Sequence, residues 1–181
     1  GTYHDLKWEM ERQVAAERRL STVTLCPGAC LGPFDWKAGT SAILWQLRGG
    51  GECPPHPEGV VSWVDVRDVG TAIARLVKGA QAPARLLLAA QSVSFHDFLG
   101  LAAARYRPGP APPAICAAEA IALADREEHR VAAEGGRPRI SREIVDLVIH
   151  GARIDGSLAR GLLGIEYRPL DDALDAFEAW A

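Results

Sequence analysis

The stretch that decides the fold runs Val60-Val61-Ser62-Trp63-Val64-Asp65-Val66-Arg67-Asp68. Apolar and β-branched residues dominate 60–64, which predicts a strand. Asp65 follows as the N-cap of a helix, and Asp68 adds negative charge in its first turn. We expect this helix to run to about Lys78 and to end at Gly79. A strand that passes directly into a helix is the repeating unit of parallel sheets.

The same alternation continues on both sides of this stretch. Strands are expected at 21–26, ending at Pro27-Gly28, and at 85–90. Pro54-Pro55-His56-Pro57 and Gly49-Gly50-Gly51 predict a surface loop, and Arg107 to Pro113, with four prolines, predicts a linker. Helices are expected at 3–19, about 40–47, 95–105 with Ser94 as N-cap, 114–133, 141–149, 155–163 and 170–180. The fold class is therefore α/β, with strands joined by helical crossovers and a mainly helical end.

Composition excludes several classes of protein. The chain has 181 residues, 48% hydrophobic residues and a net charge of −3, with its basic residues spread along the sequence. It predicts no nucleic-acid partner and no membrane partner. No secretory signal or apolar run of membrane-spanning length is seen, so we expect a cytoplasmic protein. Its four cysteines form no C-x-x-C pair, and we predict free thiols and no metal site.

Tyr3 and Lys7 are the candidate catalytic residues. They lie four apart in a helical pattern, so their side chains share one face. An ammonium near a phenol stabilises the phenolate, and such a tyrosine can protonate a carbonyl or deprotonate a hydroxyl while hydride moves to or from a nicotinamide. The spacing alone also fits an ordinary exposed pair on a helix.

Five further segments follow this pair in a fixed order. They are Met10-Glu11, residues 23–35 (V-T-L-C-P-G-A-C-L-G-P-F-D), Val64 to Val69 (V-D-V-R-D-V), the strand at 85–90 followed by Ser94-Phe95, and the closing segment Asp155 to Gly164 with Arg168-Pro169-Leu170. Together with Tyr3-x-x-x-Lys7, this order resembles the C-terminal part of the extended short-chain dehydrogenase/reductases, the NAD-dependent epimerase/dehydratase and dihydroflavonol-reductase-like enzymes.

The resemblance implies a partial Rossmann-like parallel sheet with flanking helices and a mainly helical substrate-binding lobe. Residues 1–106 would be the C-terminal part of the Rossmann-like domain, with an inserted substrate-loop region. Residues 107–181 would form the substrate-binding lobe. The whole would act on a carbonyl or hydroxyl small molecule with NADP or NAD, by ketone reduction or by sugar-type epimerisation or dehydration.

The resemblance also implies roles for individual residues. Tyr3 would be the general acid/base, and Lys7 would assist it and bind the ribose of the cofactor. Pro27, Gly28, Ala29 and Cys30 match the loop that passes the nicotinamide, where backbone amides meet the carboxamide. Arg67 and Asp68 match a recurrent motif of the family, but we expect structural roles for both. Asp68 would favour the helix N-terminus, and Arg67 would fix the strand against a neighbouring segment.

One part of the family pattern is missing from the sequence. No G-x-x-G-x-x-G loop, which would hold the dinucleotide phosphates, is present. We therefore expect the cofactor to be bound mainly by a missing N-terminal half, or by a partner chain that carries this loop. A homodimer is also compatible with the sequence.

Alternatives remain open at this point. The chain could be a non-catalytic binding or scaffolding module that has lost dinucleotide binding, or an unrelated α/β domain. Four tryptophans could line a substrate pocket or pack in the core: Trp8, Trp36, Trp45 and Trp63. The sequence does not distinguish NAD from NADP and does not identify the substrate.

Overall fold

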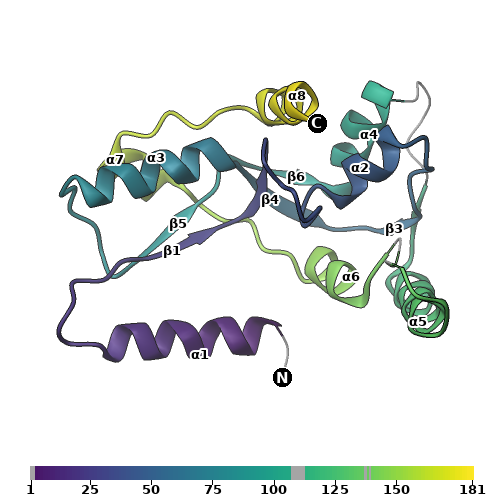
Figure 1. Cartoon of the computed structure of the whole chain (residues 1–181), viewed down its shortest axis with the longest axis horizontal. Coiled ribbons are helices and arrows are strands. Elements are labelled where there is room, and N and C mark those ends of the chain that lie inside the picture. The colour runs from purple at the N-terminus through teal and green to yellow at the C-terminus, as the bar shows by residue number, and fades with distance from the viewer. Residues whose placement is uncertain (1–2, 107–112, 137, 139) are drawn as a thin grey trace.

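The computed structural model describes residues 3–106, 113–136, 138 and 140–181. Within these ranges the chain forms short strands flanked by helices on both sides (Figure 1). Of the predicted linker at 107–113, only Pro113 falls inside the described residues.

The strands pair in three ladders, built around one central strand. The described strands are β1 (Thr24–Pro27), β2 (Ala29–Leu31), β3 (His56–Pro57), β4 (Val60–Asp65), β5 (Arg85–Leu88), β6 (Gln91–Ser94) and β7 (Ala114–Ile115). The central strand β4 is parallel to β2 and antiparallel to β6. β1 is parallel to β5, and β3 is parallel to β7. The prediction of an α/β fold with a Rossmann-like parallel arrangement is confirmed, and the antiparallel β4–β6 pair is an addition to it.

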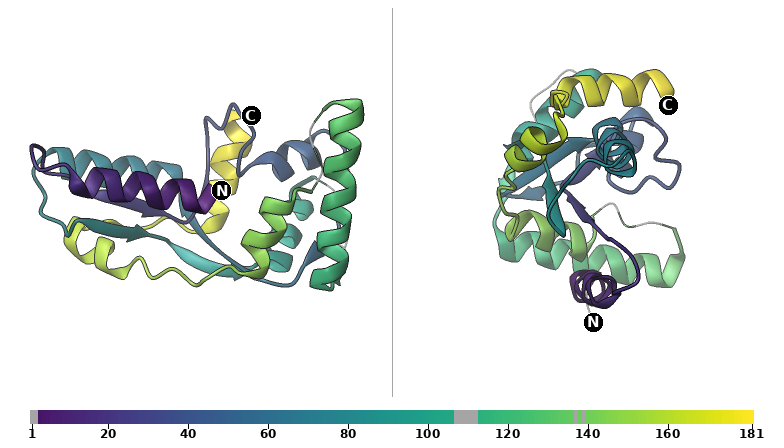
Figure 2. Two further views of the ribbon diagram at one scale, coloured as in Figure 1. Left: turned by 90° about the horizontal axis from the view of Figure 1, so that it is seen from below. Right: turned by 90° about the vertical axis from the view of Figure 1, so that its left-hand side faces the viewer.

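Helices cover both sides of these strands. They are α1 (Tyr3–Ala16), α2 (Ala42–Arg48), α3 (Val66–Val77), α4 (Phe95–Tyr106), α5 (Ala117–Glu134), α6 (Arg142–Ile149), α7 (Ser157–Leu163) and α8 (Leu170–Trp180). Around the β1–β5 pair, α3 lies on one side of the strands and α1 on the other (Figures 1 and 2). On β4 the helices divide differently, because Ala72 of α3 belongs to the cluster of Val64 and Leu174 of α8 to the cluster of Trp63. The sheet is therefore a middle layer, as in α/β folds.

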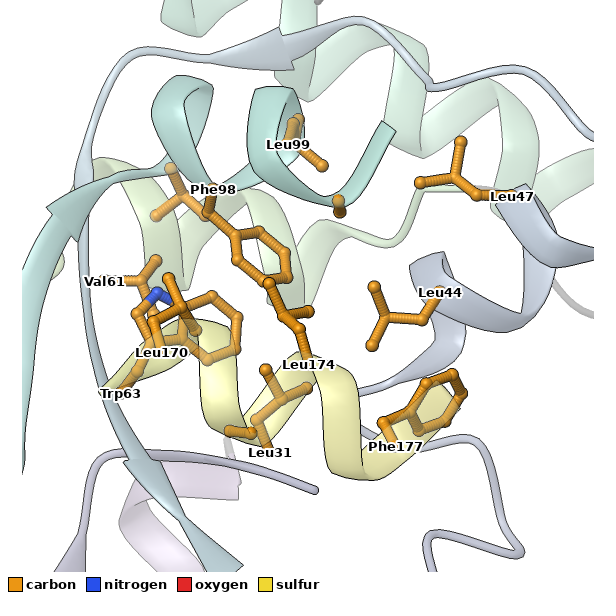
Figure 3. Packing of buried hydrophobic residues seen from close by; sticks show 13 residues of the cluster. Leu31, Leu44, Leu47, Val61, Trp63, Phe98, Leu99, Leu170, Leu174 and Phe177 are labelled. Atoms are coloured by element: carbon orange, nitrogen blue, oxygen red, sulfur yellow. The ribbon is translucent and has the colours of Figure 1, made fainter. Parts of the chain in front are cut away.

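Side chains on the two faces of β4 belong to two different hydrophobic clusters. Successive side chains of a strand point to opposite faces, and Trp63 and Val64 accordingly enter different clusters. On one face Trp63 stacks on Phe98 with ring centroids 4.1 Å apart, beside Leu31 of β2 and Leu174 of α8 (Figure 3). On the other face Val64 belongs to a cluster with residues of β5, α7 and the segment that follows α7.

The predicted helix ends are confirmed where a side chain or a glycine marks them. The Asp65 carboxylate accepts a hydrogen bond of 2.8 Å from the backbone N–H of Arg67 at the start of α3. Ser94 accepts from the backbone N–H of Asp97 at the start of α4, and Ser141 accepts from that of Ile144 in α6. Beyond α3, Gly79 has a φ of +97°, a conformation that favours glycine.

Two predicted loops contain strands. Residues 29–31, expected to continue a loop from Pro27, form β2 because their backbone lies beside that of Trp63, Val64 and Asp65. The prediction of a surface loop at Pro54-Pro55-His56-Pro57 is wrong for its last two residues. His56 and Pro57 are buried and pair with Ala114 and Ile115. Ala114 and Ile115, expected to begin a helix, therefore form β7 instead, and α5 begins only at Ala117. Short strands of this kind lack a periodic pattern, since their partners lie far away in the sequence.

The end of the chain returns to the sheet. Ala159, Leu163 and Ile165 join the cluster around Val64, while Leu170, Leu174 and Phe177 join the cluster around Trp63. By contrast, α5 and α6 pack on each other and on β3. The division of the chain at residue 106 stays a prediction.

None of the helices in the described ranges combines the length and the apolar character needed to cross a membrane. The described residues also contain no group of three or more His, Cys, Asp or Glu placed to hold a metal ion.

Candidate active site on the first helix

The helix α1 brings Tyr3 and Lys7 together, as predicted. The Lys7 ammonium nitrogen lies 5.4 Å from the centroid of the Tyr3 ring, within the range of a cation–π contact. Tyr3 is 55% exposed, and Lys7 is exposed as well. The arrangement leaves the phenol hydroxyl open to a molecule approaching from outside, with a positive charge beside it.

The direction of α1 decides where this pair lies relative to the sheet. The helix runs antiparallel to β1, so its N-terminal turn lies at the end of the sheet where β1 passes into β2 (Figure 1). The carboxyl ends of parallel strands lie at this edge, where open α/β sheets bind their ligands. The first turn of α1, which carries Tyr3 and Lys7, therefore lies toward the same end of the β1–β5 pair as the other predicted site residues, Pro27 to Cys30.

The segment Pro27 to Cys30 was predicted to be a loop. In the structure it connects β1 to β2 through the single residue Gly28. Pro27 is the last residue of β1, and Ala29 and Cys30 pair with Trp63 and Val64 in β2. Between them, the Gly28 N–H donates to the carbonyl oxygen of Leu88 at 2.8 Å. A Cβ at residue 28 would collide with the carbonyl oxygen of Ser62, so only glycine fits here.

This geometry restricts what the segment can offer a cofactor. The Gly28 amide is already engaged with Leu88. Cys30 is half-buried with its thiol 3.7 Å from the Gly28 carbonyl oxygen; burial, and secondarily the charge of Asp35, raises the pKa of this thiol. No hydrogen bond or ion pair joins Pro27–Cys30 to Tyr3 or Lys7 in the part of the chain that the structure describes.

A contact that sequence reasoning missed ties α1 to the sheet. The Glu11 carboxylate lies 3.2 Å from the Arg85 guanidinium nitrogen Nε, which also lies 3.3 Å from the Cys26 sulfur. The Cys26 thiol in turn lies 3.6 Å from Glu11. These three residues come from α1, β1 and β5. The signal in the sequence was Met10-Glu11, which we matched to the family motif without assigning a role to Glu11.

The motif Asp65-Val66-Arg67-Asp68 has structural contacts on the opposite side of the sheet. Arg67 forms an ion pair of 2.5 Å with Asp65 and donates to the carbonyl oxygen of Asp172 on α8. Asp68 is almost fully buried; it accepts from the Arg168 backbone N–H at 2.8 Å and from the Arg168 guanidinium. Asp68 thus holds the segment before α8, a role that reaches beyond the helix N-terminus where we expected it to act.

A hollow of about 430 Å³ lies beside this pair. Its walls are α3 and the segment between α7 and α8, with Thr71, Arg75 and Glu166 among its lining residues. Because α3 and α1 lie on opposite sides of the strands (Figure 2), this hollow is separate from Tyr3 and Lys7.

Most of the four tryptophans pack against other aromatic side chains. Trp63 is buried in the stack with Phe98, and Trp45 packs edge-on against Phe177 at 5.3 Å. Trp36 is exposed but contacts Trp180 with centroids 4.8 Å apart. Trp8 is exposed on α1. The packing role that the sequence left open therefore applies to Trp45 and Trp63.

A buried histidine, His56, was also missed. The Nε2 atom of His56 lies 3.2 Å from Nδ1 of His96, and its own Nδ1 lies 3.4 Å from the Pro54 carbonyl oxygen. Burial lowers the pKa of His56, the Pro54 carbonyl raises it, and His96 lowers it further. The prolines around His56 pointed to an exposed loop, so no signal in the sequence indicated this burial.

Comparison with known proteins identifies the fold. No family model and no curated protein sequence matches this chain. Solved structures do match. A nucleoside-diphosphate-sugar epimerase from Pseudomonas aeruginosa is 24% identical, with a TM-score of 0.70 over 96% of this chain and 53% of that one. This chain therefore shares the fold of that epimerase.

Two further structures of this fold were solved with a bound cofactor. The Bordetella bronchiseptica enzyme solved in complex with NAD and UDP is 13% identical, with a TM-score of 0.63 over 94% of this chain and 47% of that one. The yeast methylglyoxal/isovaleraldehyde reductase complexed with NADPH is 18% identical, with a TM-score of 0.51 over 98% of this chain and 52% of that one. The chain spans about half the length of these structures.

Proposed function

We propose that this chain is the catalytic-tyrosine and substrate-binding part of an NAD(P)-dependent oxidoreductase that acts on a carbonyl or hydroxyl small molecule. The observation that carries the proposal is the Tyr3–Lys7 pair, with the ammonium 5.4 Å from the ring centroid at the ligand-binding edge of a short-chain dehydrogenase fold. Fold alone supports many activities, so the proposal rests on this pair.

Tyr3 acts as the general acid in reduction and as the general base in oxidation. Its hydroxyl gives a proton to the carbonyl oxygen of the substrate, or takes one from a substrate hydroxyl. The Lys7 ammonium favours the negatively charged phenolate that remains after proton donation. Both groups are exposed on α1, so the substrate can reach the phenol without displacing any packed side chain.

The cofactor is NADP or NAD, whose nicotinamide, when bound, donates or accepts the hydride. The residues of this chain that would hold it are Lys7, at the ribose hydroxyls, and the segment Pro27, Gly28, Ala29 and Cys30, near the nicotinamide. Gly28 would contribute through its lack of a side chain, because its N–H already binds Leu88. The dinucleotide phosphates would be bound by an N-terminal half, or by a partner chain, that carries the glycine-rich loop.

Proteins of the same fold suggest two reaction classes for this chain, carbonyl reduction and sugar epimerisation. One neighbour is named as a sugar-nucleotide epimerase and another as an aldehyde reductase. Both chemistries can use a tyrosine as acid or base. A cytoplasmic protein that binds a small-molecule substrate fits either chemistry, and a homodimer is compatible with both.

The second candidate is a non-catalytic binding or scaffolding module of the same fold. The absence of any buried residue on α1 favours this alternative. A helix that carries catalytic groups is normally held in place by its surroundings. This module would bind a partner through the fold without turnover of a nicotinamide cofactor.

Kinetics with NADPH and NADH separate the two candidates. The protein, in the form that its gene encodes, is tested for oxidation of both cofactors with a panel of aldehydes and ketones. Tyr3→Phe should reduce kcat by about 10²- to 10⁴-fold, the usual contribution of a general acid. Tyr106→Phe is the matched control, because the Tyr106 hydroxyl donates to Glu178 on α8 and not to any residue of α1.

Turnover that depends on Tyr3 and not on Tyr106 supports the oxidoreductase. Equal turnover by wild type and Tyr3→Phe contradicts it. Absence of NAD(P)H binding and turnover by a folded protein supports the non-catalytic module.

A further inference from the structure

The helix that carries Tyr3 and Lys7 has an unusual attachment. None of the 14 residues of α1 is buried, and its apolar side chains are exposed, among them Leu6 at 61% and Met10 at 49%. Apolar packing therefore does little to fix α1 on β1 and β5. An isolated helix of this length is only marginally stable in water, so its position must come from other contacts.

Polar contacts of Glu11 attach α1 to β1 and β5. The carboxylate meets the Arg85 guanidinium on β5 at 3.2 Å and the Cys26 thiol on β1 at 3.6 Å. β1 and β5 are neighbours in parallel register, with Cys26 opposite Leu87. One side chain of α1 therefore contacts both strands of this ladder. Its carboxylate is only 23% exposed, although the helix around it is open to solvent.

The other acidic residue in the middle of α1 makes a different set of contacts. Glu9 pairs with Arg12 at 2.9 Å and with Gln13 at 3.1 Å, both on the same helix. Glu9 therefore stabilises the helix itself, whereas Glu11 joins the helix to the sheet. The two residues form a natural matched pair for experiment.

We propose that Glu11 is a positioning residue that, through Arg85 and Cys26, holds α1 so that Tyr3 and Lys7 lie at the ligand-binding edge of the sheet. Glu11 lies about two turns along the helix from Tyr3. A rotation or shift of α1 at Glu11 would therefore move the phenol relative to Pro27 and Cys30. The proposal rests on the proposed function for the role of Tyr3, but the attachment itself can be tested without any activity.

Hydrogen exchange tests the attachment. Glu11→Gln and Arg85→Gln should each increase the exchange rate of the α1 amides by about two- to fivefold, the range for a partly exposed ion pair. Glu9→Gln is the control for loss of a carboxylate on the same helix. The exchanged pair Glu11→Arg with Arg85→Glu should restore the slow exchange, because the opposite charges again meet.

Kinetics then test the positioning role. In Glu11→Gln we expect kcat to fall by about tenfold with little change in KM, because a misplaced acid loses transition-state contacts while the substrate still binds. The charge-exchanged variant should recover kcat.

Three results would overturn the proposal. Exchange in α1 that is unchanged in both single variants removes the attachment. Failure of the charge-exchanged variant to restore slow exchange removes the ion pair as its cause. Normal kcat with faster exchange removes the positioning role. A normal rate for Tyr3→Phe, in contrast, is the distinct sign that the proposed function itself has failed.

Discussion

The layer built on β4 and the helix α1 are held in different ways. Around β4, aromatic and aliphatic side chains from α4 and α8 close over Trp63, and a buried carboxylate, Asp68, fastens the segment before α8. On α1 no side chain is buried, and the contact with the sheet runs through the partly exposed Glu11. The buried side chains around β4 therefore stabilise the fold. The proposed catalytic residues lie instead on α1, a helix that makes few buried contacts with the rest of the molecule.

The largest effect is expected from the core stack. Phe98→Ala removes a fully buried ring that stacks on Trp63 at 4.1 Å. The free energy of unfolding should fall by about 3–5 kcal/mol, the usual loss for this truncation in a core. Urea unfolding followed by circular dichroism measures it. A loss below about 1 kcal/mol would show that the β4 layer is not the stable part of the molecule.

A smaller loss is expected at the buried carboxylate. Asp68→Asn removes the charge that faces the Arg168 guanidinium, which is itself partly exposed. We expect a loss of about 2–3 kcal/mol in the free energy of unfolding, below the range for a fully buried pair. Asp172→Asn, an exposed carboxylate on α8, is the control and should change little. Equal effects of the two variants would remove Asp68 as the fastening point.

A pH dependence should follow from His56. Burial is the first cause that lowers the pKa of His56 in the folded protein, so folding favours the neutral imidazole. The contribution of His56 to the free energy of unfolding is fully present above the pKa of histidine in the unfolded chain, about 6.5. This contribution is lost as the pH falls below that value.

The measurement is the urea midpoint between pH 7.5 and pH 5. It should decrease toward pH 5 in the wild type, and the decrease should be smaller in His56→Gln. His129→Gln changes an exposed histidine on α5 and should retain the wild-type slope. A wild-type slope in His56→Gln would contradict the assignment to His56.

The smallest effect is expected on α1. Met10 is half exposed, so Met10→Ala should change the free energy of unfolding by less than about 0.5 kcal/mol. The same urea titration measures it. A loss of more than 1 kcal/mol would show that the apolar side of α1 is packed in solution, and the contrast with β4 would disappear.

Local patterns predicted much of this fold. The stretch Val60 to Asp68 and the caps at Asp65, Ser94 and Ser141 behave as their residue types dictate, because strand alternation and helix capping depend on neighbours in the chain. The strands β2, β3, β6 and β7 were missed. Each is short and is defined by a partner that lies 28 or more residues away.

The candidate site was predicted in part for the same reason. The Tyr3–Lys7 contact depends on helical spacing, which the sequence displays. The contact of Glu11 with Arg85 joins residues 74 positions apart, and that of Asp68 with Arg168 joins residues 100 positions apart. No local pattern specifies such pairs, although both lie in segments that the family resemblance singled out.

One measurement tests the central claim most directly, namely that Tyr3 serves hydride transfer in this protein. The protein in its encoded form is incubated with NADPH or NADH deuterated at the transferable position and with carbonyl compounds, and the alcohol product is examined by mass spectrometry. We predict deuterium in the product with the wild type and with Tyr106→Phe, and a loss of at least about 100-fold in its rate of formation with Tyr3→Phe. Deuterium transfer at the same rate in Tyr3→Phe, or no transfer by a folded protein that binds the cofactor, would contradict the account.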